Sequence, residues 1–247
     1  MGIEPLFLHQ LLLDTSLLVG HAKRRRLPTW DLDEGYLVHS VLGEAFGELR
    51  PQPYAITGSG GRYLTVLGYS AVDSVTLRQQ ADLYADPSIH QIFPWDRIPS
   101  SKPMPTDWRP GQRLGFELRV CPVVRVGNTH PHFRPGAEVD AFLAEASKQG
   151  EDGGLDRQAV YRSWLDTQLE THGGARVERA EQSRFELGKH TRRTQGKERK
   201  ARHQTRPDAT FHGVLEVTDS LTFHTLLARG VGRHRAFGFG MILLRRP

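Results

Sequence analysis

The spacing of apolar residues near the start of the chain predicts a strand, a helix and a hairpin. Residues 6–13 form an apolar run of strand length, although a short helix would show the same pattern. Apolar side chains then fall on one face of a helix that ends at Gly47 and is capped by Asp31 or Asp33. Residues 54–69 form two apolar runs around a glycine-rich turn, which predicts a hairpin.

The elements up to residue 126 complete one βαββαβ series. A second helix is predicted over residues 71–84, and a proline-rich connection over 87–110 leads to an alternating strand over 113–126. The basic segment 15–30 is expected to be a loop. This order of strands and helices is typical of the ferredoxin-like fold, which RNA-recognition motifs share.

The order partly recurs in the second half, so we expect an α+β protein with two tandem ferredoxin-like units, βαββαβ twice. The N-terminal unit would span residues 1–110 and the C-terminal unit residues 111–247, with a helical insertion over 137–148. The other predicted elements are a helix over 156–172, an extended segment over 175–187, a strand over 211–217, a helix over 219–229 capped by Thr218 or Asp219, and a glycine-rich strand over 236–244.

Composition excludes several classes of protein. The mean hydropathy of the 247 residues is −0.48, and no apolar run approaches the roughly 20 residues of a membrane-spanning helix. The single cysteine, Cys121, excludes an intrachain disulfide and a multi-cysteine zinc site, as is usual in a reducing cytoplasm. The basic residues 23–26 follow the N-terminal apolar stretch, which is the wrong order for a signal peptide. We therefore expect a cytoplasmic protein without a membrane partner.

Positive charge is concentrated in one segment. The net charge is +5, and residues 189–206 hold eight Lys or Arg residues and one acid. A localised positive field on an otherwise near-neutral chain is typical of a polyanion binder and favours nucleic acid as the partner. The alternative is a solvated basic loop. The candidate binding residues are Lys189, Arg192, Arg193, Lys197, Arg199, Lys200, Arg202 and Arg206.

A glycine-rich segment near the C-terminus has two interpretations. It reads GVGRHRAFGFG over residues 230–240. Glycine lets the backbone approach a phosphate closely, and neighbouring arginines supply charged donors to the same anion. The glycines can equally form a turn that packs against a helix. The candidate binding residues are Gly230, Gly232, Arg233, Arg235, Gly238 and Gly240.

The same segment resembles a known family. LARGVGRHRAFGFGMILL, preceded by FHGVLEVTD, resembles the C-terminus of the CRISPR repeat-processing endoribonucleases of the CasE type, which belong to subtype I-E Cascade systems. VYRSWLDTQ is similar to the Trp-Leu helix of that family, and FELRVCPVV to the strand that opens its second half. The resemblance implies that the basic segment lies where the family has a hairpin or loop that tracks an RNA stem.

Tyr36-x-x-His39 is the candidate catalytic pair. Two residues three apart share one helical face, and histidine can move protons near neutral pH. Such a pair is structural in most proteins, but CasE-like enzymes carry Tyr-x-x-His on or near their first helix. The resemblance therefore implies that His39 is the general base for the ribose 2′-OH or the general acid for the leaving 5′-oxygen. It implies that Tyr36 positions or polarises the scissile phosphate.

The implied reaction is metal-independent cleavage of precursor RNA at the 3′ base of the repeat stem. It would leave a 2′,3′-cyclic phosphate (or a 3′-phosphate) and a 5′-OH, and no cofactor is expected because the nucleophile is part of the RNA. No lysine follows His39 closely, so Arg50, Arg233 or Arg235 is expected to stabilise the charge on phosphorus. The resemblance also implies that the protein stays on the crRNA 3′ stem-loop as a Cascade subunit beside the backbone protein.

Two other functions remain open at this point. One is a non-catalytic RNA-binding subunit of a ribonucleoprotein complex, with the same fold and a structural Tyr36 and His39. The other is a ribosome-associated or tRNA-binding basic protein, which would show no preference for a repeat hairpin.

Overall fold

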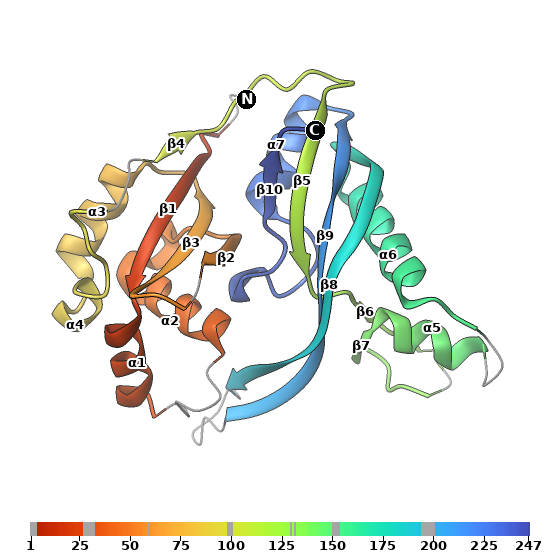
Figure 1. The fold of residues 1–247 in the computed structure, drawn as a ribbon, viewed down its shortest axis with the longest axis horizontal. Helices are drawn as coiled ribbons and strands as arrows, with labels where there is room; N and C mark the ends of the chain where they lie inside the picture. Colours follow the sequence, from red (N-terminus) through yellow and green to blue (C-terminus); the bar gives the residue numbers. More distant parts are fainter. Residues whose placement is uncertain are drawn as a thin grey trace.

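Two four-stranded antiparallel sheets form the framework of the chain (Figure 1). The computed structural model describes residues 4–26, 33–58, 60–97, 101–128, 130, 132–149, 154–193 and 201–247. Within these ranges the strand order is β2-β3-β1-β4 in the first sheet and β10-β5-β9-β8 in the second, and β6 and β7 pair by themselves.

The first unit takes its elements from the N-terminal part of the chain. They are β1 (Phe7–Asp14), α1 (Thr15–Arg24), α2 (Glu34–Phe46), the 3-10 turn η1 (Gly47–Leu49), β2 (Tyr54–Gly58), β3 (Tyr63–Ser70), α3 (Ser74–Tyr84), α4 (Pro87–His90) and β4 (Lys102–Pro103). Leu11 and Leu13 of β1 pack with the apolar face of α2 in one buried cluster, so the helix covers one face of the sheet.

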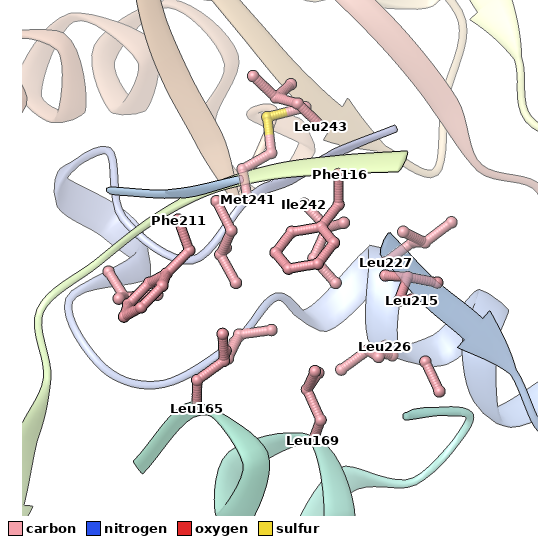
Figure 2. Close-up of a cluster of buried hydrophobic side chains, with 14 of the residues drawn as sticks. Phe116, Leu165, Leu169, Phe211, Leu215, Leu226, Leu227, Met241, Ile242 and Leu243 are labelled. Atoms are coloured by element: carbon pink, nitrogen blue, oxygen red, sulfur yellow. The ribbon is translucent and has the colours of Figure 1, made fainter. Parts of the chain in front are cut away.

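The second unit repeats this plan with an insertion. Its elements are β5 (Arg113–Val120), β6 (Val123–Arg125), β7 (Glu138–Asp140), α5 (Ala141–Gln149), α6 (Arg157–His172), β8 (Ala175–Arg193), β9 (Ala201–Val217), α7 (Ser220–Arg229), the 3-10 turn η2 (Arg235–Phe237) and β10 (Ile242–Arg245). Leu165 and Leu169 of α6 and Leu226 of α7 face Phe116 and Ile242 across the buried layer in Figure 2.

Both sheets place their strands in the order that defines the ferredoxin-like fold. Numbered within each unit, the fourth strand lies beside the first, followed by the third and the second. This order results from two βαβ crossovers that bring the first and third strands of a unit side by side. The predicted α+β class with tandem ferredoxin-like units is therefore confirmed. The division proposed between residues 110 and 111 falls between β4 and β5.

The prediction that residues 15–30 form a loop is wrong for its first part. Residues Thr15–Arg24 form α1, because the Asp14 carboxylate accepts from the backbone N–H groups of Ser16 and Leu17 and caps the helix. Leu18 and Ala22 on one face of α1 are buried against the first sheet's core. Arg25 and Arg26 form a turn after α1, and the last part of the predicted loop, residues 27–30, lies outside the described residues.

The strand predicted over 113–126 does not close the first unit. It is interrupted at Cys121 and Pro122, and its main part, β5, opens the second sheet. The closing strand of the first unit is instead β4, which pairs with only Phe7 and Leu8 of β1. A two-residue strand in a proline-rich connection has no periodicity, so the pattern of apolar residues could not reveal it.

Three further boundaries differ from the predictions. The final strand is confined to β10, because the preceding residues turn through η2 and the left-handed Gly238 and Gly240. The insertion predicted as a helix over 137–148 begins with β7 and becomes helical only at Ala141. β8 and β9 extend far beyond the predicted 175–187 and 211–217, into the basic segment, since cross-strand pairing continues to Arg193 and Ala201.

Two tyrosines join the units. Tyr69 of β3 belongs to the same buried cluster as the core of the second unit, and its hydroxyl donates to the carbonyl of Ile242 at 3.0 Å. The hydroxyl of Tyr54 lies 2.7 Å from the carbonyl oxygen of Gly35 and 2.9 Å from that of Ala236. These bonds fix the C-terminal segment against α2. In the described ranges no helix has the length and apolar character needed to cross a bilayer.

Candidate functional site

Helix α2 carries Tyr36 and His39 at the border of its buried face. Asp33 caps the helix, because its carboxylate accepts from the backbone N–H of Tyr36 at 3.0 Å. It is one of the two caps that the sequence predicted. Leu37 and Val38 are buried in the core, whereas Tyr36 and His39 are only half-buried, and Tyr36 packs against the edge of the same cluster. Both side chains therefore lie on the side of α2 that meets the glycine-rich segment.

Phe237 of the glycine-rich segment contacts both members of the pair. Its ring stacks on Tyr36, with centroids 6.5 Å apart and an interplanar angle of 9°, and lies 5.1 Å from the imidazole of His39. A side chain nearly 200 positions away in the sequence thus touches the candidate catalytic residues. The pair and the glycine-rich segment share one region of the molecule, as the sequence interpretation required.

The imidazole of His39 is held mainly in its neutral form. Burial lowers the pKa of His39, and the positive charge of Arg50 lowers it further. Within the described part of the chain, Nδ1 is buried without a hydrogen-bond partner. A neutral imidazole at neutral pH can accept a proton, which is the state a general base needs.

The glycine-rich segment closes on itself. The backbone N–H of Val231 donates to the carbonyl of Gly240 at 2.8 Å, and the N–H of Gly240 donates to the carbonyl of Arg119 at 2.7 Å. Gly230 and Gly240 have φ angles of 74° and 78°, and a Cβ on either would collide with backbone of the other strand of this turn. Close packing therefore accounts for these two glycines, and their contact with an anion stays a prediction.

The remaining two glycines of the predicted set differ from each other. Gly232 lies against the indole of Trp164, where a Cβ would come within 2.8 Å of the ring. Gly238 meets Tyr54 only at the ordinary distance of 3.4 Å. Gly238 is therefore the position in this segment where the backbone is least enclosed by its neighbours.

The three candidate arginines occupy different surroundings. Arg50 follows η1 and donates to the carbonyl of Gly47 at 2.8 Å, within electrostatic range of His39. Arg235 donates to the carbonyl of Arg229 at the end of α7, and burial lowers its pKa. Arg233 is the most exposed, with 44% of its side chain accessible, and pairs through Nε with Glu138 at 2.5 Å. Of the three, only Arg50 acts electrostatically on His39.

The described residues of the basic segment, 189–193 and 201–206, lie at the far end of the β8–β9 hairpin. In the register of the two strands, Arg192 lies opposite Arg202, and Lys189 lies opposite Thr205. In Figure 1 this end of the hairpin projects beyond the other strands of the second sheet. Lys197, Arg199 and Lys200 lie outside the described residues, and the side chains of Lys189, Arg192, Arg193 and Arg202 are likewise not described. Arg206 lies where the hairpin rejoins the body, with 11% of its side chain exposed.

Two features of the site were missed by the sequence interpretation. Arg119 of β5 pairs through two nitrogens with Asp208 of β9 and lies over the ring of Phe239, directly beneath the glycine-rich segment. Glu138 of the insertion gathers Arg206, Arg233 and His234. No local sequence motif reveals Asp208 or Glu138. Asp208 lies 89 positions from Arg119, and Glu138 lies 95 positions from Arg233.

Comparison with known proteins points to one family. No curated protein matches the sequence. The chain is similar in structure to CRISPR endoribonuclease Cse3 bound to a 19-nucleotide RNA, with 22% identity, a TM-score of 0.65, and coverage of 97% of this chain and 99% of that one. It is also similar to Cas6e from Escherichia coli K-12, with 17% identity, a TM-score of 0.58, and coverage of 98% and 100%.

A third similar structure is a chain of a CRISPR RNA-guided surveillance complex, with 14% identity, a TM-score of 0.56, and coverage of 98% and 100%. At these identities the three structures establish the shared fold. The family model described as CRISPR associated protein matches residues 7–246. The chain therefore belongs to the family of CRISPR-associated proteins, as its resemblance to the CasE type predicted.

Proposed function

We propose that this protein is an endoribonuclease that binds the stem-loop of CRISPR repeat RNA and cuts the precursor at the 3′ base of the stem. The observation that supports it most directly is the contact of Phe237 with both Tyr36 and His39. This contact joins the proton-transfer pair to the segment that bears Arg233. The fold shared with the Cse3 endoribonuclease and with Cas6e supports the same activity.

The chemistry needs no group beyond the protein and the RNA. His39, neutral in the free protein, accepts the proton of the ribose 2′-OH. The 2′-oxygen attacks the adjacent phosphorus, the bond from phosphorus to the 5′-oxygen breaks, and that oxygen takes up a proton from protonated His39 or from water. The products are a 2′,3′-cyclic phosphate and a 5′-OH. Proximity is supplied by the RNA itself, so the protein must align one linkage and stabilise charge on it.

Arg50 is the best placed of the candidate arginines to stabilise that charge. Its charge acts on His39, and its Nη1 is oriented by the carbonyl of Gly47. Tyr36 lies one helical turn before His39 and keeps its ring parallel to that of Phe237. We assign Tyr36 the positioning of the scissile phosphate, through its phenolic O–H.

The hairpin supplies the grip on the RNA stem. Its described basic residues lie on two paired strands, so positive charge is concentrated along the hairpin, where it can follow the phosphates of an A-form helix. After the cut the protein stays on the 3′ stem-loop as a Cascade subunit, a role supported by the fold it shares with a chain of an RNA-guided surveillance complex. The competing function, a non-catalytic RNA-binding subunit, would use the same hairpin.

Cleavage of labelled repeat RNA in EDTA separates these functions. The RNA is the repeat of the CRISPR array in the same genome, and a hairpin of scrambled sequence is the specificity control. His39→Ala is expected to lose site-specific cleavage and keep binding, whereas His132→Ala, at an exposed site on the insertion, keeps both. Binding without cleavage by the unaltered protein would support the non-catalytic function instead.

A further inference from the structure

Glu138 gathers positive groups from two parts of the chain that the proposed function assigns to RNA. Its carboxylate pairs with Arg206 of β9 and with Nε of Arg233. Nε2 of His234 lies 2.6 Å from Oε1 of Glu138 and 2.9 Å from Nη1 of Arg206. Glu138 belongs to β7 of the insertion, which the ferredoxin-like plan does not require.

The insertion holds Glu138 rigidly because Asp140, two residues further along the same strand, is also anchored. Asp140 pairs with Arg157 at 3.1 Å, and its carboxylate accepts from the hydroxyl of Tyr161 at 2.9 Å. Residues two apart on a strand point to the same side, so Glu138 and Asp140 both face the second unit. Val139, between them, packs into the insertion's own small core.

The guanidinium of Arg233 is consequently fixed at one end and open at the other. Its Nε is held by Glu138, whereas Nη1 and Nη2 have no partner in the described part of the protein, and 44% of the side chain is exposed. Arg206 and Glu138 are 11% and 15% exposed. A guanidinium that is already oriented loses less rotamer freedom when its free fork binds a phosphate.

We propose that Glu138 is a positioning residue that orients Arg233 to bind a phosphate of the RNA backbone, with Arg206 and His234 completing the support. This inference rests on the proposed function, since it names a residue that prepares the RNA-binding surface. It gives the insertion a role, because the insertion supplies the only carboxylate that pairs with Arg233 among the described residues.

The direction of the effect separates this role from simple electrostatics. A carboxylate near an RNA-binding surface repels phosphate, and it also competes with phosphate for the same arginines. If Glu138 did only this, its removal would strengthen RNA binding. If it orients Arg233, its removal weakens binding, because the released guanidinium no longer holds the orientation in which it contacts the phosphate, and that contact is lost.

The test measures the affinity of Glu138→Ala for the labelled repeat hairpin over a series of salt concentrations. We expect about a tenfold weaker affinity, the scale of one charge-assisted hydrogen bond. We also expect the slope of log affinity against log salt to fall by about 0.7–0.9, the value of one lost phosphate contact. Arg233→Ala should give the same two changes, and the double variant should be no weaker than either single one.

Two further variants complete the test. Glu138→Gln keeps the size and one acceptor oxygen, so it folds if the alanine variant does not, and it should show a smaller loss in the same direction. Glu145→Gln removes a carboxylate from the same insertion, 39% exposed and paired with Lys148, and should leave affinity and slope unchanged.

Tighter binding by the Glu138 variants, or an unchanged salt slope, would overturn the inference. A wild-type protein that does not prefer the repeat hairpin over the scrambled one would overturn the proposed function, whatever the variants do. The two failures are therefore distinguishable. Thermal unfolding of each variant checks that a change in affinity is not a change in the folded fraction.

Discussion

Replacing Gly35 with alanine tests the contact on which the candidate site depends. Gly35 lies in the first turn of α2, and a Cβ there would come within 3.1 Å of the carbonyl carbon of Phe237 and nearer still to its oxygen. The neighbour is backbone and cannot rotate away. The variant must therefore push η2 away from the helix, which disturbs the ring contacts of Phe237 with Tyr36 and His39.

The magnitude follows from the interactions that the shift strains. The hydroxyl of Tyr54 bridges the carbonyls of Gly35 and Ala236, and losing one such bond costs about 1 kcal/mol. Overpacking adds about 1–3 kcal/mol, and the better helix propensity of alanine returns less than about 1 kcal/mol. We expect a net loss of about 2 kcal/mol in the free energy of unfolding. Misplacement of the reacting groups should also reduce the cleavage rate constant at least about tenfold.

Gly43 on the same helix provides a matched control, because a Cβ there would meet nothing within 4 Å. Gly43→Ala should stabilise the protein by about 0.5–1 kcal/mol and leave cleavage unchanged. Urea unfolding and single-turnover cleavage of the repeat RNA measure both quantities. The reasoning is refuted if Gly35→Ala behaves like Gly43→Ala, since η2 would then not be packed against α2 as described.

Three other predictions follow from the same geometry. The single-turnover rate should rise with pH as His39 loses its proton, with a midpoint below the ordinary histidine value of about 6.5. Arg50→Ala removes a positive charge that disfavours protonation of His39 and should therefore move that midpoint to higher pH. A rate that falls over this range would assign His39 the role of acid. Tyr54→Phe should lower the free energy of unfolding by about 1 kcal/mol, measured in urea, because it removes the hydroxyl that links the units; an unchanged value would show that this link does not contribute. Asp208→Ala leaves Arg119 without its bidentate partner beneath the glycine-rich segment, so the free energy of unfolding in urea should fall by about 3 kcal/mol. A fall of less than about 1 kcal/mol would contradict the described pairing.

The regular elements of the fold were largely readable from local pattern. The stripe of apolar residues in α2, the hairpin of β2 and β3, and the helices α6 and α7 occur where their periodicity predicts them. Asp219 caps α7, as one of the two predicted alternatives. β4 and the strand part of the insertion were not readable. Both are too short for a period to develop, and their pairing is decided by the strand beside them, β1 for β4 and β6 for β7.

The candidate site was readable only as two separate pieces. The sequence indicates a Tyr-x-x-His pair on one helix and a glycine-rich segment far along the chain, and resemblance to the CasE type connected them. The partner of the pair, Phe237, and the partner of Arg233, Glu138, have no signal in their own neighbourhoods. Side-chain contacts of this kind depend on the relative placement of elements, which no local period encodes.

The sequence alone therefore determined the longer strands and most of the longer helices, the concentration of positive charge and the chemistry available at Tyr36 and His39. Hydrophobic periodicity, capping and net charge are properties of neighbouring residues, so they survive without a fold. Only the tertiary structure decided that η2 packs on α2, that burial and Arg50 lower the pKa of His39, and that an inserted carboxylate pairs with Arg233. Burial and long-range pairing exist only once distant segments are packed together, because desolvation and short-range contacts act over a few ångströms.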